Sequence, residues 1–414
     1  MFHVKWKGLL FGLLIGCAPM VCQASEVSDD TVVYDVTDYQ VIPDNGLDDT
    51  KEFQTVLDLA KGASSEVVIR VPEGVYDLSG TLDVYSNTHL ILEDGAELVT
   101  TGGDIFRGAH VDEHGDVCDN RSDTCSHGDY TQTHDIILEG GVLRAKDRDA
   151  SVFSGFIVFS HGKNITIKNM TIDGYCSHAI RFYGCQNVLV ESCLIENNPY
   201  TEARRDGGAF ESIQLGDNCS EASEGYPYPH DDSMTRDAVI RNCVFQNVIT
   251  GIGNHGDCPM VENVLIEHCT FRDVGGQKGR SIIDGSGYGI DLTTMSQVTI
   301  QHNTFDITEH GYGAICGTLW DRAASTGHII RNNVIYSDGW YGITLECGAE
   351  AEIYENVITG RAGLTGIQVD SASKASVHHN LFLNVDRGVK LRGDRSEAYE
   401  NVYENCVSGN ADTR

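Results

Sequence analysis

Amide, imidazole and carboxylate side chains recur at matching places in three segments of the middle of the chain. Gln214 lies in Ser-Ile-Gln-Leu-Gly, His255 ends Gly-Ile-Gly-Asn-His, and Asp291 lies in Gly-Ile-Asp-Leu-Thr. Gly216 and Gly253 remove side chains beside them, which leaves room for a sugar ring between the functional groups. A base, a carboxylate and an amide held together are groups that acid–base chemistry on a sugar requires.

Carboxylates and cations surround these three side chains in the sequence. Hydrolysis of a glycosidic bond needs two carboxyl groups about 5 to 9.5 Å apart, one of them protonated. Elimination from a uronate needs a neutralised substrate carboxylate, a base near the C5 proton and an acid at the leaving oxygen. We therefore expect catalysis from His255, Asp291, Glu211 and Asp257, and substrate binding from Arg181, Gln214, Asp217, Lys278 and Arg280.

Several of these residues also have a structural explanation. His255 can be an ordinary histidine on a polar rim, and Asp291 can be its counterpart. Glu211 falls at an inward or bend position, where a carboxylate can hold a turn. Arg181 can be a solvated surface charge. Both explanations stay open for each residue.

A repeated short strand has to position these side chains. Its pattern of small, apolar, variable, apolar and variable residues recurs from Ala179 to Arg392. Strand alternation sends the second and fourth residues inward, so the third and fifth should form a polar strip on an outer face. The third positions are Arg181, Gln214, Gly253, Asp291, Cys316, Thr344, Gln368 and Lys390, and the fifth are Tyr183, Gly216, His255, Thr293, Thr318, Glu346, Asp370 and Arg392.

A second recurring strand sets the period of a little over twenty residues. Asn164-Ile-Thr-Ile-Lys-Asn-Met170 and Asn187-Val-Leu-Val-Glu-Ser-Cys193 are two of its copies. A strand-rich repeat of this length predicts the coils of a parallel β-helix, in which equivalent residues stack into ladders. One such ladder would contain Cys193, Cys243, Cys269, Asn303, Asn333, Asn356, Asn380 and Asn401. Its three cysteines are then expected to be a reduced interior stack, with disulfides or a metal as the alternative.

The N-terminal part of the chain should cap the coils. The apolar spacing over 51–61 predicts an amphipathic helix with Thr50 or an aspartate as its N-cap, and strands are predicted at 67–71, 82–84 and 90–92. A signal peptide at 1–24, a cap with the first coils at 25–155 and the main coils at 156–414 complete the organisation. The last two segments should form one continuous domain.

The opening of this cap resembles a known superfamily. Asp48-Asp49-Thr50 with Gln54, followed by Val71-Pro-Glu-Gly-Val-Tyr76, is similar to the pectate-lyase-like superfamily. The resemblance implies an all-β fold, a single-stranded right-handed parallel β-helix with a short N-terminal capping α-helix. It also implies polysaccharide lyases, polygalacturonase-like hydrolases or uronan epimerases. The sequence departs from the hydrolases, because their paired acid strings are missing.

The N-terminal segment predicts export from the cell, and the net charge limits the kinds of partner. Lys5 and Lys7, an apolar run and Cys-Gln-Ala24 form a secretory signal, while Leu-Ile-Gly-Cys17 resembles a lipobox that would attach a lipid. No later run reaches the roughly 18 to 20 apolar residues of a membrane span. The 29 basic and 61 acidic residues give a net charge of -32, which argues against nucleic acid as a partner. We expect a periplasmic, secreted or outer-membrane lipid-anchored protein.

Two polar segments leave further alternatives open. Cys118 with Cys125, and less clearly Cys219 with Cys258, could form disulfides in an exported protein. No cofactor is required by the proposed chemistry, but acidic residues of one loop offer oxygen ligands for Ca²⁺, although their spacing matches no EF-hand. These are Asp112, Asp116, Asp119 and Asp123.

The sequence thus predicts an exported enzyme that cleaves an acidic, uronate-containing polysaccharide by β-elimination. A polygalacturonase-like glycoside hydrolase is the first alternative, since the chain's own negative charge repels a polyuronate. A non-catalytic glycan-binding surface protein is the second, because a fold does not determine a function.

Overall fold

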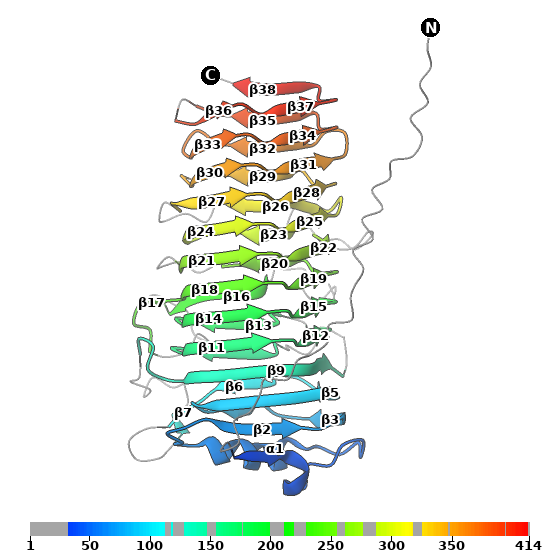
Figure 1. The fold of residues 1–414 in the computed structure, drawn as a ribbon, viewed down its shortest axis with the longest axis vertical. Coiled ribbons are helices and arrows are strands. Elements are labelled where there is room, and N and C mark those ends of the chain that lie inside the picture. Colours follow the sequence, from blue (N-terminus) through cyan, green and yellow to red (C-terminus); the bar gives the residue numbers. More distant parts are fainter. Residues whose placement is uncertain are drawn as a thin grey trace. The chain divides into compact units, whose positions relative to one another are not determined.

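Two long parallel sheets run along the solenoid from blue to red in Figure 1. The computed structural model describes residues 32–111, 117–118, 128–146, 155–175, 177–198, 211–218, 229–254, 261–275, 287–317, 325–346, 348–393 and 395–412. Each main coil contributes two strands to the first sheet, sheet A, and one strand to the second, sheet B. This is the predicted parallel β-helix.

Sheet A holds 23 strands and begins at the cap. Its strands are β1 (Val33–Asp35), β2 (Val67–Val71), β3 (Gly74–Leu78), β5 (Thr88–Thr100), β9 (His134–Ala145), β11 (Lys163–Lys168), β12 (Thr171–Asp173), β14 (Gln186–Glu191), β15 (Leu194–Glu196), β18 (Arg236–Arg241), β19 (Val244–Gln246), β21 (Val261–Glu267), β22 (Thr270–Val274), β24 (Met295–Gln301), β25 (Thr304–Ile307), β27 (His328–Arg331), β28 (Val334–Ser337), β30 (Glu350–Tyr354), β31 (Val357–Gly360), β33 (Lys374–His378), β34 (Leu381–Leu383), β36 (Glu397–Tyr399) and β37 (Val402–Glu404).

Within the described residues, sheet B holds 13 strands, of which β17 pairs antiparallel with β16. They are β4 (Leu82–Val84), β6 (Phe106–Gly108), β10 (Ile157–Ser160), β13 (Ile180–Tyr183), β16 (Glu211–Asn218), β17 (Ser233–Met234), β20 (Thr250–Gly253), β23 (Gly287–Asp291), β26 (Gly311–Gly317), β29 (Tyr341–Leu345), β32 (Thr365–Val369), β35 (Arg387–Leu391) and β38 (Ser408–Asp412). A separate pair joins β7 (His110–Val111) to β8 (Val117–Cys118).

A two-residue bend separates the two sheet A strands of each main coil, such as 332–333 and 379–380. The first residue of this bend has a positive φ, for example 54° at Asn332 and 56° at His379. The next residue belongs to the predicted interior ladder, whose amides bond from coil to coil. Asn333 Nδ2 donates to Asn356 Oδ1 at 3.0 Å, and Asn356 Nδ2 donates to Asn380 Oδ1 at 2.9 Å. The ladder prediction is confirmed.

The upstream part of the same ladder is made of thiols. Cys193, Cys243 and Cys269 are buried and free, as predicted for a reduced interior stack. Burial raises the pKa of the Cys269 thiol well above its ordinary value, which keeps it protonated. Next to it, Phe271 stacks against the rings of neighbouring coils at centroid distances of 4.7 and 4.6 Å, so the core is closely packed.

The cap contains α1 (Thr50–Leu57) between the short 3-10 turns η1 (Val36–Tyr39) and η2 (Asp58–Ala60). Its apolar side, with Phe53 and Val56, is buried. The predicted aspartate N-cap is confirmed as Asp49, although its side chain makes no capping hydrogen bond. Asp48 accepts from Thr50 N at 3.1 Å instead and from Ser79 Oγ at 2.6 Å, which lowers its pKa to about 2.

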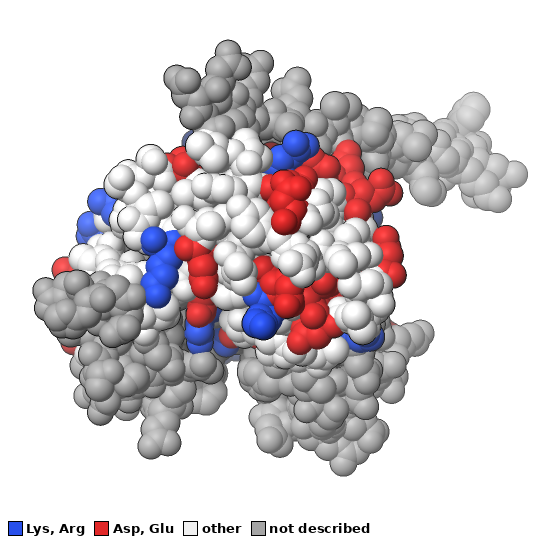
Figure 2. All heavy atoms as spheres, turned by 90° about the horizontal axis from the view of Figure 1, so that it is seen from below, with Lys and Arg blue, Asp and Glu red and all other residues white. Residues whose placement is uncertain are grey.

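Acidic side chains gather on the capped end of the solenoid (Figure 2). Residues 32–61 contain seven acidic and two basic residues: Asp35, Asp38, Asp44, Asp48, Asp49, Glu52 and Asp58 against Lys51 and Lys61. Within the described ranges, no helix is long and apolar enough to cross a membrane. The signal peptide, Cys17, Cys125, Cys219, Cys258 and the acidic loop of 112, 116, 119 and 123 lie outside the described residues, so these predictions stay predictions.

Candidate functional site

The strand registers of sheet B bring the predicted polar strip together. Arg181 pairs with Gln214, and Gln214 pairs with Gly253. Ile252 pairs with Ile290, so Asp291 lies beside Gly253 in the next coil. The strip then continues through Cys316, Thr344, Gln368 and Lys390. The predicted order of the third positions is therefore confirmed.

Two predicted acidic residues flank the glycine gap. A Cβ atom added at Gly253 would lie 2.8 Å from Glu211 Cγ and 3.0 Å from Asp291 Cβ. The two carboxyl-bearing side chains thus approach the same point from opposite sides, one from the start of β16 and one from the end of β23. The glycine is required because a side chain at 253 would displace one of them.

The expected exposure of this strip is wrong. The exposed fractions of Gln214, Asp291 and Thr344 are 1%, 7% and 0%. Neighbouring side chains form hydrogen bonds with these residues: Tyr183 Oη donates to Gln214 Oε1 at 3.1 Å, and Thr293 Oγ1 donates to Asp291 Oδ1 at 2.6 Å. The middle of the strip is therefore a packed polar layer and not an open groove.

Glu211 and Arg181 also have partners. His178 Nδ1 lies 2.8 Å from the Glu211 carbonyl and 3.5 Å from its Oε2, and both side chains are almost fully buried. The guanidinium of Arg181 donates to Asp104, which lies 77 positions earlier in the sequence. Burial raises the pKa of Tyr183, so its hydroxyl stays protonated and can donate. Buried polar groups that satisfy one another hold a layer rigid.

Several predicted site residues are not part of this picture. His255, Asp257, Lys278 and Arg280 lie outside the described residues. Asp217 lies in β16, where its backbone pairs with Met234. Among the residues that the structure describes, no group of three His, Cys, Asp or Glu side chains is arranged to hold a metal. The roles predicted for these residues remain predictions.

Sequence reasoning missed a second ordered feature, a row of side chains on the outer face of sheet A. This outer row lies two positions before each ladder residue and contains Glu139, Lys168, Glu191, Arg241, Glu267, Gln301, Arg331, Tyr354, His378 and Tyr399. Its fixed offset from the Cys and Asn column is the signal that could have revealed it.

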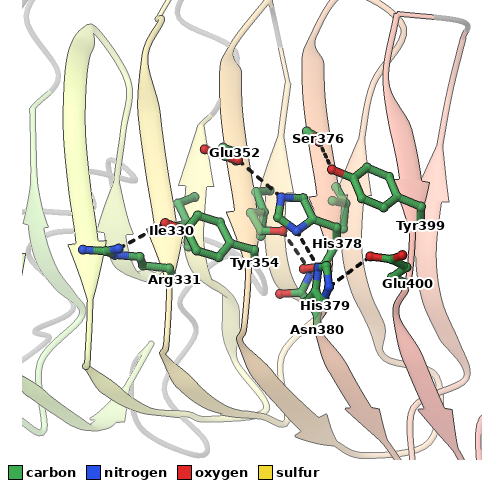
Figure 3. A network of polar contacts seen from close by, with 12 residues as sticks. Ile330, Arg331, Glu352, Tyr354, Ser376, His378, His379, Asn380, Tyr399 and Glu400 are labelled. Atoms are coloured by element: carbon green, nitrogen blue, oxygen red, sulfur yellow. Dashed lines mark hydrogen bonds and ion pairs between the residues drawn. The ribbon is translucent and has the colours of Figure 1, made fainter.

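The outer row changes character along the solenoid. Its first part consists of alternating charges and amides, such as Arg241 Nε on Glu191 Oε1 at 2.7 Å. Its last part is a stack of rings, which Figure 3 shows in one line. The centroids of Tyr354 and His378 are 5.2 Å apart, and those of His378 and Tyr399 are 4.9 Å apart. Arg331 Nη1 joins the two parts through Tyr354 Oη at 3.2 Å.

Comparison with known protein families identifies the family of this chain. A family described as "Right handed beta helix region" matches residues 154–318, 213–382 and 322–413, which together cover more than half of the sequence. The chain belongs to this family. The hand of the coils is therefore the one predicted.

Individual relatives are more distant. The plasmin and fibronectin-binding protein A of Streptococcus pneumoniae is 26% identical over 421 residues, which cover 84% of this chain and 57% of that protein. This chain thus spans little more than half the length of that relative. A solved structure of PfbA, a surface adhesin of Streptococcus pneumoniae, has a TM-score of 0.70 at 19% identity, with 91% of each chain covered.

The same fold also carries enzymes. The A-module of a mannuronan C-5 epimerase from Azotobacter vinelandii has a TM-score of 0.58 at 14% identity, with 91% of this chain and 97% of that chain covered. At these identities the structural likeness shows the fold alone.

Proposed function

We propose that the protein is an exported surface-binding protein of the adhesin kind, which holds a macromolecular partner without converting it. The observation that carries this proposal is the packed polar layer of sheet B. Gln214 and Asp291, which a catalytic groove would present to a polymer, are buried and bonded to Tyr183 and Thr293. The relation to a protein named for binding plasmin and fibronectin supports the same conclusion.

Export is part of this proposal. The predicted signal at 1–24 would carry the chain across the membrane, and a lipid on Cys17 would keep it at the surface of the cell. Incorporation of a radiolabelled fatty acid into the wild-type protein but not into Cys17→Ser tests the anchor. A protein that is released unlabelled would leave secretion without an anchor.

A screen for turnover tests the central claim. The mature chain from residue 25 is incubated with uronic-acid and neutral polysaccharides, while unsaturated products and reducing ends are recorded. We expect neither signal on any polymer, together with saturable binding to a macromolecular partner. Unsaturated products would instead identify a lyase, and reducing ends alone would identify a hydrolase.

One observation favours polysaccharide cleavage as a second candidate. Glu211 and Asp291 approach Gly253 from both sides, as a pair of catalytic carboxylates would. In this second proposal the chain is a pectate-lyase-like enzyme, and His255 or one of the carboxylates acts as its base. If the screen detects product, Glu211→Gln, Asp291→Asn and His255→Ala should each abolish it, whereas Glu355→Gln at an exposed position should leave it unchanged.

A further inference from the structure

A cleft of about 540 Å³ opens where β27, β30, β33 and β36 begin. It lies on sheet A, away from the strip of sheet B in which the sequence places catalysis. Its lining combines carboxylates, hydroxyls and cations over a backbone with small side chains: Gly327, His328, Ile329, Glu350, Ala351, Glu352, Lys374, Ala375, Ser376, Arg395, Ser396 and Glu397. A concave site with a few placed polar groups is typical of ligand binding.

The register of the strands orders the outward groups of this cleft. One row contains Glu352, Ser376 and Glu397, so two carboxylates lie on either side of a hydroxyl. The ring stack of Tyr354, His378 and Tyr399 lies two residues further along the same strands, and Figure 3 shows Glu352 and Ser376 beside it. Aromatic rings and carboxylates placed together attract cations.

The groups that are free to bind a ligand are mainly acceptors. The Glu397 carboxylate has no hydrogen bond or ion pair with any described residue, and the Glu352 carboxylate has only His378 Nε2 at 3.3 Å. Beneath the cleft, His328 shares the inward-facing row of Ala351 and Ala375, and its exposed fraction is 1%. Its Nδ1 has no hydrogen-bond partner within the described part of the chain.

The protonation of His328 follows from its other nitrogen. Ser325 Oγ donates to Met295 O at 2.5 Å and lies 2.5 Å from His328 Nε2. Because the serine proton is used, Nε2 must donate, which leaves Nδ1 as an acceptor. Burial also lowers the pKa of His328 to about 4, so the ring is neutral near pH 7. His328 therefore adds no positive charge beneath the cleft.

The two cations of the cleft do not cancel this preference. Arg395 is held within the protein, since its Nη1 donates to Ala372 O at 2.6 Å and its Nη2 lies 3.7 Å from Glu350 Oε1. Lys374 pairs with Glu350 in a row two residues before the Glu352 row. The carboxylate row therefore lies between Lys374 and the ring stack. The net charge of -32 adds a field that draws positively charged partners to the surface.

We propose that this cleft binds the cationic side chain of a lysine or arginine in a basic segment of a partner protein. The carboxylates of Glu352 and Glu397 hold the cation, and the ring stack beside them covers its alkyl stem. This assignment rests on the proposed function as a binding protein and names the chemistry that the partner presents.

Binding of labelled hexalysine to the mature chain tests this assignment, with hexaglutamate and maltohexaose as comparison ligands. In the double variant Glu352→Gln with Glu397→Gln we expect hexalysine affinity to fall about fivefold or more. Lys374→Gln should strengthen binding, because it removes a repelling charge. The matched control is Glu355→Gln with Glu404→Gln, two exposed acids outside the cleft lining, which should change affinity by less than about twofold.

Three outcomes would overturn the assignment. Equal loss of hexalysine binding in both double variants would mean that only the overall field attracts the peptide. Binding of hexaglutamate that Lys374→Gln weakens would make the cleft an anion site. Binding of maltohexaose that is lost in the cleft variant would make it a sugar site. Product formation in the polysaccharide screen would remove the proposed function and leave the result of this peptide measurement standing.

Discussion

The polar strip of sheet B and the cleft on sheet A are built by the same stacking of coils, but they differ in exposure. In the strip, Gln214 and Asp291 are buried and accept hydrogen bonds from Tyr183 and Thr293. In the cleft, the side chains of Glu397 and Lys374 reach solvent. Register alone therefore creates rows of polar groups, and the burial of a row decides whether it can meet a partner.

The largest difference between the two regions should come from added volume. Gly253→Leu forces a side chain against Glu211 and Asp291, so we expect a loss of about 2 kcal/mol in the free energy of unfolding. Ser376→Leu on the half-buried outer face should cost less than about 0.5 kcal/mol. Urea unfolding of both variants measures this. Equal losses would mean that the strip is no more closely packed than the cleft.

The next largest difference in unfolding free energy between the two sheets should come from removal of a guanidinium. Arg181→Met leaves the partly buried Asp104 without its partner, at an expected cost of about 1.5 kcal/mol. Arg331→Met removes bonds to Gln301 and Tyr354 on the outer row, and it should cost less than about 1 kcal/mol because solvent replaces them. The same urea titrations report both values. A larger loss for Arg331→Met would place the more tightly bonded polar network on sheet A.

Acidification should act through His328 in the cleft. Its folded-state pKa of about 4 lies below its unfolded value, so the unfolded chain takes up a proton first as the pH falls. Stability is therefore complete above about pH 6.5 and should fall by about 1 kcal/mol down to about pH 5.5. Comparing wild type with His328→Leu across this range isolates the effect, since the variant should lose this part of the slope. An unchanged slope in the variant would assign the titration to another group.

The smallest difference in stability between the two regions should come from removal of a single hydroxyl. Tyr183→Phe leaves Gln214 Oε1 without this buried donor, so we expect a cost of about 1 kcal/mol. Tyr354→Phe loses only the bond from Arg331 at the surface and should change stability by less than about 0.5 kcal/mol. Thermal unfolding midpoints of the two variants measure this difference in stability. A neutral Tyr183→Phe would show that the strip tolerates the loss of this hydrogen bond.

Much of the fold could be predicted because its determinants are periodic. Strand alternation and the Cys and Asn column fix which residues share a row, and Gln214, Gly253 and Asp291 do stack as expected. Exposure could not be predicted in the same way. The side chain that pairs with Arg181 is Asp104, 77 positions earlier, and nothing periodic connects the two. The cleft was missed because its rows become distinctive only where Tyr354 and His378 replace the charges of earlier coils.

The amide ladder has a direction as well as a spacing. From Asn303 to Asn380 each Nδ2 donates to the amide oxygen of the next coil, so the amide dipoles of the column align in one direction. Hydrogen bonds aligned in this way polarise and strengthen one another, so the column acts cooperatively. A leucine in place of Asn356 would interrupt this alignment at one point, while the backbone pairing of β27, β30 and β33 would still join the coils.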